Sequence, residues 1–89
     1  MLPTNSLERK DIPIYHGFIK YFPDAIVEVT KQSMKGMKQH GTKGWDKSKS
    51  QDELDAMMRH LLEDDLVSVA WRALAALQRK LDKEKSNGI

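Results

Sequence analysis

The chain has 89 residues, no cysteine, 31% charged residues and a formal net charge of +2 at pH 7. These values indicate one small domain, and they exclude disulfide bonds, thiolate metal sites and the strongly basic balance expected of a specific DNA-binding protein. No apolar run approaches the roughly 20 residues that cross a bilayer, and the first residues lack a signal-peptide core. We therefore expect a cytoplasmic protein without a membrane partner.

Residues 1–22 are expected to form an ordered N-terminal arm. Its first eleven residues are polar, and Pro13 and Gly17 then interrupt an apolar and aromatic stretch too often for a helix. That composition favours an arm that packs on another surface. Tyr15 and His16 fit two roles there, since they can stack on a nucleotide base or anchor the arm.

A helix is predicted over residues 23–40. Pro23 suits the first helical position, Asp24 suits the positive end of the helix dipole, and Gly41 ends the helix. Its apolar and small residues fall on one stripe at helical spacing, namely Ile26, Val29, Ser33, Gly36 and Met37.

A short basic loop is predicted over residues 41–50, with Trp45 inside it. Ser50 then begins the pattern S-Q-D-E, which is typical of a capping box in which Glu53 reaches back to the start of the helix.

A second, longer helix is predicted over residues 51–84, with a tail over 85–89. No Gly or Pro follows until Gly88, and the apolar positions keep one helical phase through the acidic run 63–65. At 1.5 Å per residue this helix is roughly 50 Å long.

These elements predict an all-α fold, a helical hairpin with a long C-terminal helix and an N-terminal arm. The first helix is about half as long as the second and cannot cover its apolar stripe. A domain this short is marginal alone, so we expect a homo-oligomer of at least two chains.

Charge is uneven along the middle of the chain. Six lysines and one acid lie within residues 31–49, and six acids and one base lie within residues 52–65. Such neighbouring strips suit an anionic ligand, with or without a bridging cation. They equally suit two solvated faces that attract each other between subunits.

Three segments carry a family resemblance: ERKDIPIYHGFIKYFPDAIVEV, SKSQDELDAMMRHL and VAWRALAALQRKL, between about residues 8 and 82. Together they resemble the N-terminal domain of dATP/dGTP diphosphohydrolases of phages, which is similar to the all-α MazG-like nucleotide pyrophosphohydrolases. The resemblance implies an all-α homo-oligomer, a purine nucleotide ligand, and Mg²⁺ chemistry on phosphates in active relatives. It also implies a phage protein in the cytoplasm of an infected bacterial host.

The chain departs from the family pattern in two loops. After RHL the family has a Gly- and Asp-rich loop with a His, and here only LEDDLVS stands in its place. The loop before Trp45 is also shortened, to HGTKGW. Because the missing Asp and His residues are those that complete a metal site, the departure favours binding without hydrolysis.

The acids that remain for a metal ion are Asp52 and Asp55, one turn apart on one helix face. Mg²⁺ uses one or two carboxylates with waters and phosphates, but both positions equally suit helix capping or a pair with Arg59. The acids at 63–65 would fan around a helix and could not converge on one ion.

The predicted nucleotide-binding residues combine cations and aromatic rings. Arg72, among Ala and Leu, can grip a phosphate bidentately, whereas Arg59 and His60 fit either a functional role or a structural carboxylate pair. Lysines and a histidine near residues 35–43 form a phosphate strip. The full set is Tyr15, His16, Lys35, Lys38, His40, Trp45, Arg59, His60 and Arg72.

The sequence thus favours a nucleotide-binding protein that sequesters a nucleotide or a cyclic-nucleotide immune signal without a required cofactor. The alternative is a Mg²⁺-dependent (d)NTP pyrophosphohydrolase acting on purine nucleotides. A third hypothesis is an oligomer without a ligand.

Overall fold

The computed structural model describes residues 1–41, 43–48 and 52–87, and all regular structure in that part of the chain is helical. The prediction of an all-α protein is therefore confirmed. Its elements are α1 (Ser6–Lys10), α2 (Ile14–Gly17), a 3₁₀ turn η1 (Ile19–Tyr21), α3 (Pro23–His40), α4 (Glu53–Leu62) and α5 (Leu66–Asn87). None of the helices in these ranges has the length and apolarity needed to cross a membrane.

The helix α3 has the predicted bounds. Pro23 stands at its first turn, and Gly41 ends it in the left-handed region with φ of 67°, where its N–H donates to the carbonyl of Met37. The predicted stripe of α3 is half-buried, and the helix packs against α5. Local capping chemistry therefore sets both ends of this helix.

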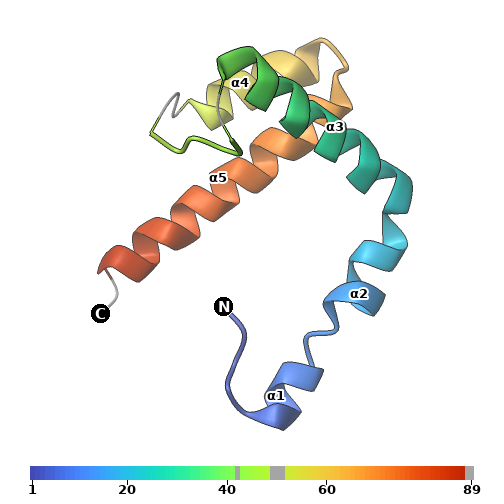
Figure 1. The fold of residues 1–89 in the computed structure, drawn as a ribbon, viewed down its shortest axis with the longest axis vertical. Helices are drawn as coiled ribbons and strands as arrows, with labels where there is room; N and C mark the ends of the chain where they lie inside the picture. The colour runs from blue at the N-terminus through green and yellow to red at the C-terminus, as the bar shows by residue number, and fades with distance from the viewer. Residues whose placement is uncertain (42, 49–51, 88–89) are drawn as a thin grey trace.

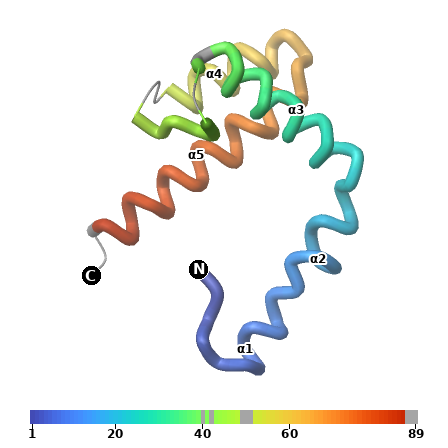
Figure 2. The backbone as a smooth tube through the Cα atoms, viewed as in Figure 1, coloured from blue at the N-terminus to red at the C-terminus, as the bar shows by residue number. Residues whose placement is uncertain are grey.

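The single helix predicted over residues 51–84 is wrong. Its first part, α4, ends at Leu62, and α5 begins at Leu66, with the two helices packed against each other. Figure 2 shows the backbone turning back between them. The body of the protein therefore has three helices, α3, α4 and α5, rather than a pair (Figure 1).

The turn between α4 and α5 is built by two of the acids that were assigned to a helix. Asp64 takes a left-handed φ of 58°. Its N–H donates to the carbonyl of Leu61 at 3.1 Å, and the N–H of Asp65 donates to the backbone carbonyl of His60 at 2.9 Å. This pair of hydrogen bonds is the Schellman pattern of a helix end. The Asp65 side chain then accepts from the N–H of Ser68 at 3.2 Å, so it caps α5.

We expect Asp64→Gly to raise the free energy of unfolding by about 1 kcal/mol, because a left-handed backbone costs a residue with a β-carbon roughly that much. Asp64→Val should lower it, since a branched side chain tolerates this region least. Chemical denaturation measures both. Asp64→Asn is the control that removes the charge and keeps a tolerant side chain. Equal stability in all three variants would contradict the strained turn.

The arm contains short helices, which replace the expected non-helical arm. Asn5 caps α1 by accepting from the N–H groups of Leu7 and Glu8, yet all side chains of residues 4–25 are exposed. The arm contacts the body through η1 against α3, and Figure 1 shows it extending away from α4 and α5. In the described part of the chain, the arm therefore packs on the body only where η1 meets α3.

The interior of the described part is small. Its buried apolar side chains are Ala56 and Ala75, beside buried Glu53 and Ser68. The chain exposes 7500 Å², whereas a compact monomer of this mass exposes roughly 5,300 Å². Its radius of gyration is 15.2 Å, against roughly 12 Å for a compact chain of this length. The single chain is thus open, with much apolar surface left in solvent.

Candidate functional site

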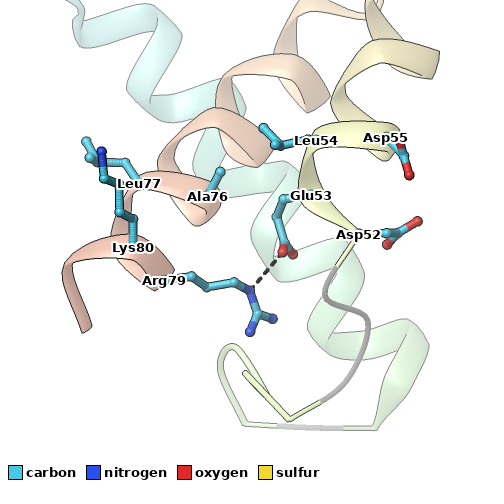
Figure 3. A pocket seen from close by; sticks show the side chains of 8 residues that line it. All are labelled: Asp52, Glu53, Leu54, Asp55, Ala76, Leu77, Arg79 and Lys80. Carbon is cyan, nitrogen blue, oxygen red and sulfur yellow. Dashed lines mark ion pairs between the residues drawn. The ribbon is translucent and has the colours of Figure 1, made fainter. Parts of the chain in front are cut away.

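A buried carboxylate joins α4 to α5. Glu53, the first residue of α4, is 3% exposed. Its Oε2 lies 2.8 Å from Nε of Arg79, and its Oε1 accepts from Nη1 of Arg72 at 3.4 Å. Figure 3 shows Glu53 pointing across to Arg79. Arg72 and Arg79 are seven residues apart, two turns along one face of α5, so both can reach one acid.

Two tryptophans extend this cluster toward the loop before α4. The rings of Trp45 and Trp71 pack edge to face, with centroids 5.4 Å apart. The Arg79 guanidinium and the Lys47 ammonium each lie 5.1 Å from the Trp45 ring, and Arg72 lies 5.4 Å from that of Trp71. A cation and the aromatic face beneath it attract each other. These contacts therefore hold residues 45–47 against α5.

The loop is fixed at a second point by Asp82. Nζ of Lys47 lies 2.7 Å from one carboxylate oxygen, and Gln78 donates to the other at 2.9 Å. The hydrogen bonds from Lys47 and from Gln78 hold the pKa of Asp82 below its ordinary value. Because Arg79 also donates to the carbonyl of Lys47 at 2.8 Å, the loop is held by both its backbone and its side chain.

The structure brings together part of the predicted nucleotide site. Trp45 and Arg72 meet in the cluster, through Trp71. Arg59 lies 3.1 Å from Asp52 and His60 lies 3.2 Å from Asp65, so both take part in carboxylate pairs.

The other predicted residues lie apart from that cluster. Tyr15 and His16 pack edge to face in α2, on the exposed arm. Lys35 and Lys38 lie on the exposed side of α3. The side chain of His40 lies outside the described residues, and so does Ser50, on which the capping box was predicted.

The sequence analysis missed Glu53, Arg79, Lys47 and Asp82 as partners in the cluster. The spacing of Arg72 and Arg79 was an available signal, since seven residues place both on one helix face. No signal pointed to their shared acid, because Glu53 stands at a helix start where an acid also serves the helix dipole.

An open groove of about 630 Å³ lies between the start of α4 and the C-terminal half of α5. It is lined by Asp52, Glu53, Leu54, Asp55, Ala76, Leu77, Arg79 and Lys80 (Figure 3). Asp52 and Asp55 project from the same side of α4. Across the described ranges no three His, Cys, Asp or Glu side chains gather as a metal site, so an ion here would rest on these two acids, one of them paired with Arg59.

Acid is expected to weaken the turn through Asp65. Hydrogen bonds from Ser68, and then the charge and hydrogen bond of His60, hold the pKa of Asp65 below its ordinary value of 3.8. Its stabilising contribution is therefore complete above about pH 4 and is lost as the pH falls through the lowered value. Thermal melting of the native chain and of Asp65→Asn should differ at pH 6, and the difference should shrink as the pH falls below 3.8. Asp11→Asn, in the exposed arm, is the control. A constant difference would contradict this pairing.

Comparison of the chain with protein family models, with curated proteins and with solved structures found no match. The relation to the dATP/dGTP diphosphohydrolase domain therefore stays a prediction that rests on the three sequence segments.

Proposed function

We propose that this chain binds a phosphate-bearing nucleotide and sequesters it without hydrolysis, as a homo-oligomer. The observation that carries this is a set of exposed lysines, Lys35 and Lys38 in the second half of α3 and Lys43 in the loop after it. Within the described ranges none of them has an ion pair, whereas Arg59, Arg72, Arg79 and Lys47 all contact carboxylates. These lysines are therefore among the cations of the described residues that have charge to offer an anion.

Lys35 and Lys38 lie on the outer side of α3. The half-buried stripe of this helix faces α5, and with 3.6 residues per turn Lys35 and Lys38 fall on the opposite side. Lys31 shares that side but lies 3.3 Å from Glu28. Neighbouring ammonium groups with no counter-charge favour phosphate oxygens.

The arm offers aromatic rings for a base. Tyr15 and Tyr21 are exposed, and stacking on such rings suits any base. The arm leaves α3 at Pro23, roughly 18 Å along the helix from Lys35. A site that uses both the rings and the lysines is therefore best supplied by two copies of the chain, which supports an oligomeric binder.

Sequestration is preferred to hydrolysis because phosphoanhydride cleavage depends on metal charge and positioning. Asp52 and Asp55 are the acids available, and Asp52 is paired with Arg59. The resemblance to phage proteins makes a cyclic-nucleotide immune signal of an infected host the ligand class of interest. The alternative, a Mg²⁺-dependent (d)NTP pyrophosphohydrolase, would need these two acids.

The deciding experiment incubates the protein with linear and cyclic nucleotides, with Mg²⁺ or with EDTA, and follows both thermal melting and products. We expect a melting shift that EDTA leaves unchanged, and no product. Repeated turnover that Asp55→Asn abolishes would establish the enzyme instead. The absence of a shift with every phosphate ligand would favour an oligomer without a ligand.

The lysines give the proposal a second test. Lys35→Glu with Lys38→Glu should weaken nucleotide binding by roughly a hundredfold or more, because each charge-assisted contact contributes about 1.5–3 kcal/mol. Added salt should also weaken nucleotide binding by the native chain. Isothermal titration measures both. Lys83→Glu, an exposed lysine of α5, is the matched control, and equal losses in control and double variant would remove the lysines from the site.

A further inference from the structure

The arm carries an apolar stripe that its own chain leaves in solvent. Its members are Ile14, Phe18 and Phe22, which are between 46% and 51% exposed. The N–H of Phe18 donates to the carbonyl of Ile14 at 3.1 Å, and the rings of Phe18 and Phe22 pack edge to face with centroids 5.5 Å apart. The polar residues His16 and Lys20 stand two positions after Ile14 and Phe18, on the other side of the turn. The arm is therefore amphipathic, with its apolar side uncovered.

The body carries an apolar groove that its own arm does not reach. Leu54 of α4 and Ala76 and Leu77 of α5 lie among the residues that line the groove of about 630 Å³ (Figure 3), and both leucines are exposed. In the described part of the chain η1 contacts α3, but neither α2 nor η1 contacts α4 or α5. Figure 1 shows the arm extending away from both helices.

The stripe and the groove match in chemistry and in length. An amphipathic helical segment that lays apolar side chains, spaced by three or four residues, into a groove is a recurrent mode of recognition. Met58 and Leu61 are exposed and continue the side of α4 that begins at Leu54, over roughly 10 Å. The stripe from Ile14 to Phe22 spans roughly 12 Å on the same measure.

Two copies of the chain can satisfy both surfaces at once, because each copy has one arm to give and one groove to fill. Exchange of an identical element is a low-cost route to a closed dimer. At roughly 100 Å² for each half-exposed anchor, the stripe and the groove surface beneath it bury roughly 600 Å². Two such contacts reach roughly 1,200 Å², the lower end of specific interfaces, and the surface of the whole chain, arm included, exceeds that of a compact monomer by roughly 2,200 Å².

We infer that two copies of this chain exchange their arms, with Ile14, Phe18 and Phe22 of each copy lying in the groove between Leu54 and Leu77 of the other. This exchange specifies the homo-oligomer that the proposed function assumes. It is tested without a ligand, so a failure to bind nucleotides leaves it standing.

The native chain has no cysteine, so single-cysteine variants report the contact directly. Phe18→Cys is mixed with a tagged Leu77→Cys, or with Leu54→Cys on the other wall of the groove, allowed to exchange and oxidised. A disulfide needs β-carbons within about 4.5 Å. We expect a mixed disulfide with at least one wall, and none when a variant is oxidised alone. Lys20→Cys, on the polar side of the arm, is the matched control and should not join either wall.

A second measurement keeps the walls intact. Phe18→Asp places a charge in the stripe and should raise the dissociation constant of the assembly by roughly a hundredfold or more, whereas Lys20→Asp should leave it unchanged. Light scattering measures both. A Phe18→Asp variant that assembles like the native chain would remove the arm from the interface.

The remaining outcomes also overturn the exchange. A variant with both Phe18→Cys and Leu77→Cys that closes within one chain would show that the arm fills its own groove. Leu77→Cys joined to itself would place α5 of the second copy there instead. The absence of any mixed disulfide excludes the contact if reduced Phe18→Cys still assembles. If it does not, Tyr21→Cys with Ala76→Cys keeps the stripe and both leucines, and the absence of a disulfide between them excludes it.

Discussion

The Leu77→Asp variant is expected to scatter light as a single chain of 10.2 kDa at micromolar concentration, where the native chain gives a multiple of that mass. Leu77 is 53% exposed in the single chain and lies on the side of α5 that also carries the exposed Leu66, Leu74 and Leu81. An uncompensated polar group buried in an apolar interface costs about 4 kcal/mol. Since each copy carries the substitution, the dissociation constant should rise by at least roughly a thousandfold.

Two controls separate a lost interface from a damaged fold. Leu77→Met keeps an apolar side chain of similar volume and should stay assembled. Gln39→Asp places the same charge at an exposed polar position of α3 and should also stay assembled. A native chain that scatters as 10.2 kDa would remove the oligomer from the proposal, and circular dichroism would show whether each variant keeps its helices.

The bounds of α3 could be predicted because residues at each end of the helix determine where it begins and stops. Proline at the first turn and glycine in the left-handed cap position act within a few residues. The same reasoning separates α3 from the arm, since Pro23 stands between them. Where a helix ends by local capping, a single sequence is sufficient.

The break between α4 and α5 was missed for a physical reason. Leu62 and Leu66 are four residues apart, which is the spacing of a helical turn, so the apolar pattern runs through the reversal unchanged. The left-handed residue is Asp64 rather than glycine, and aspartate signals a helix end more weakly. Periodicity alone therefore cannot distinguish one long helix from two.

The candidate site was predicted in part. Arg72, which is unusual among Ala and Leu, and Trp45 were both in the predicted nucleotide-binding set, and the structure places them in one cluster. Their other partners come from pairs distant in sequence, since Arg72 and Glu53 are nineteen positions apart. Such a pair exists only because the chain reverses at residues 63–65, and this reversal was the feature that the sequence analysis did not find.

Glu53→Gln is expected to lower the free energy of unfolding by about 3 kcal/mol, because two partly buried arginines lose the carboxylate that they share. The side chains of Arg72 and Arg79 are 28% and 20% exposed. Water therefore solvates the two guanidinium groups poorly once the Glu53 carboxylate is gone. A chain of this length has a total stability of roughly 4–13 kcal/mol. The loss is therefore a large part of the whole, and chemical denaturation should show it.

The matched control is Asp55→Asn, which removes a neighbouring but exposed carboxylate and should change stability by less than about 0.5 kcal/mol. Rescue tests the mechanism. Glu53→Leu combined with Arg72→Met and Arg79→Met replaces the ion cluster by apolar groups, and this should restore most of the lost stability.

The Glu53→Gln variant also decides the role of Arg72. If Arg72 serves the fold, Glu53→Gln destabilises the chain and leaves the nucleotide affinity of the folded fraction unchanged, because the lysines of α3 carry the binding. If Arg72 is instead a phosphate ligand that Glu53 merely holds, Glu53→Gln keeps the fold and strengthens nucleotide binding, since the competing carboxylate is gone. We expect the first result, because Glu53 is buried with both arginines turned toward it. The two outcomes are distinguished by measuring nucleotide affinity by titration, without denaturant and at a temperature well below the midpoint of melting.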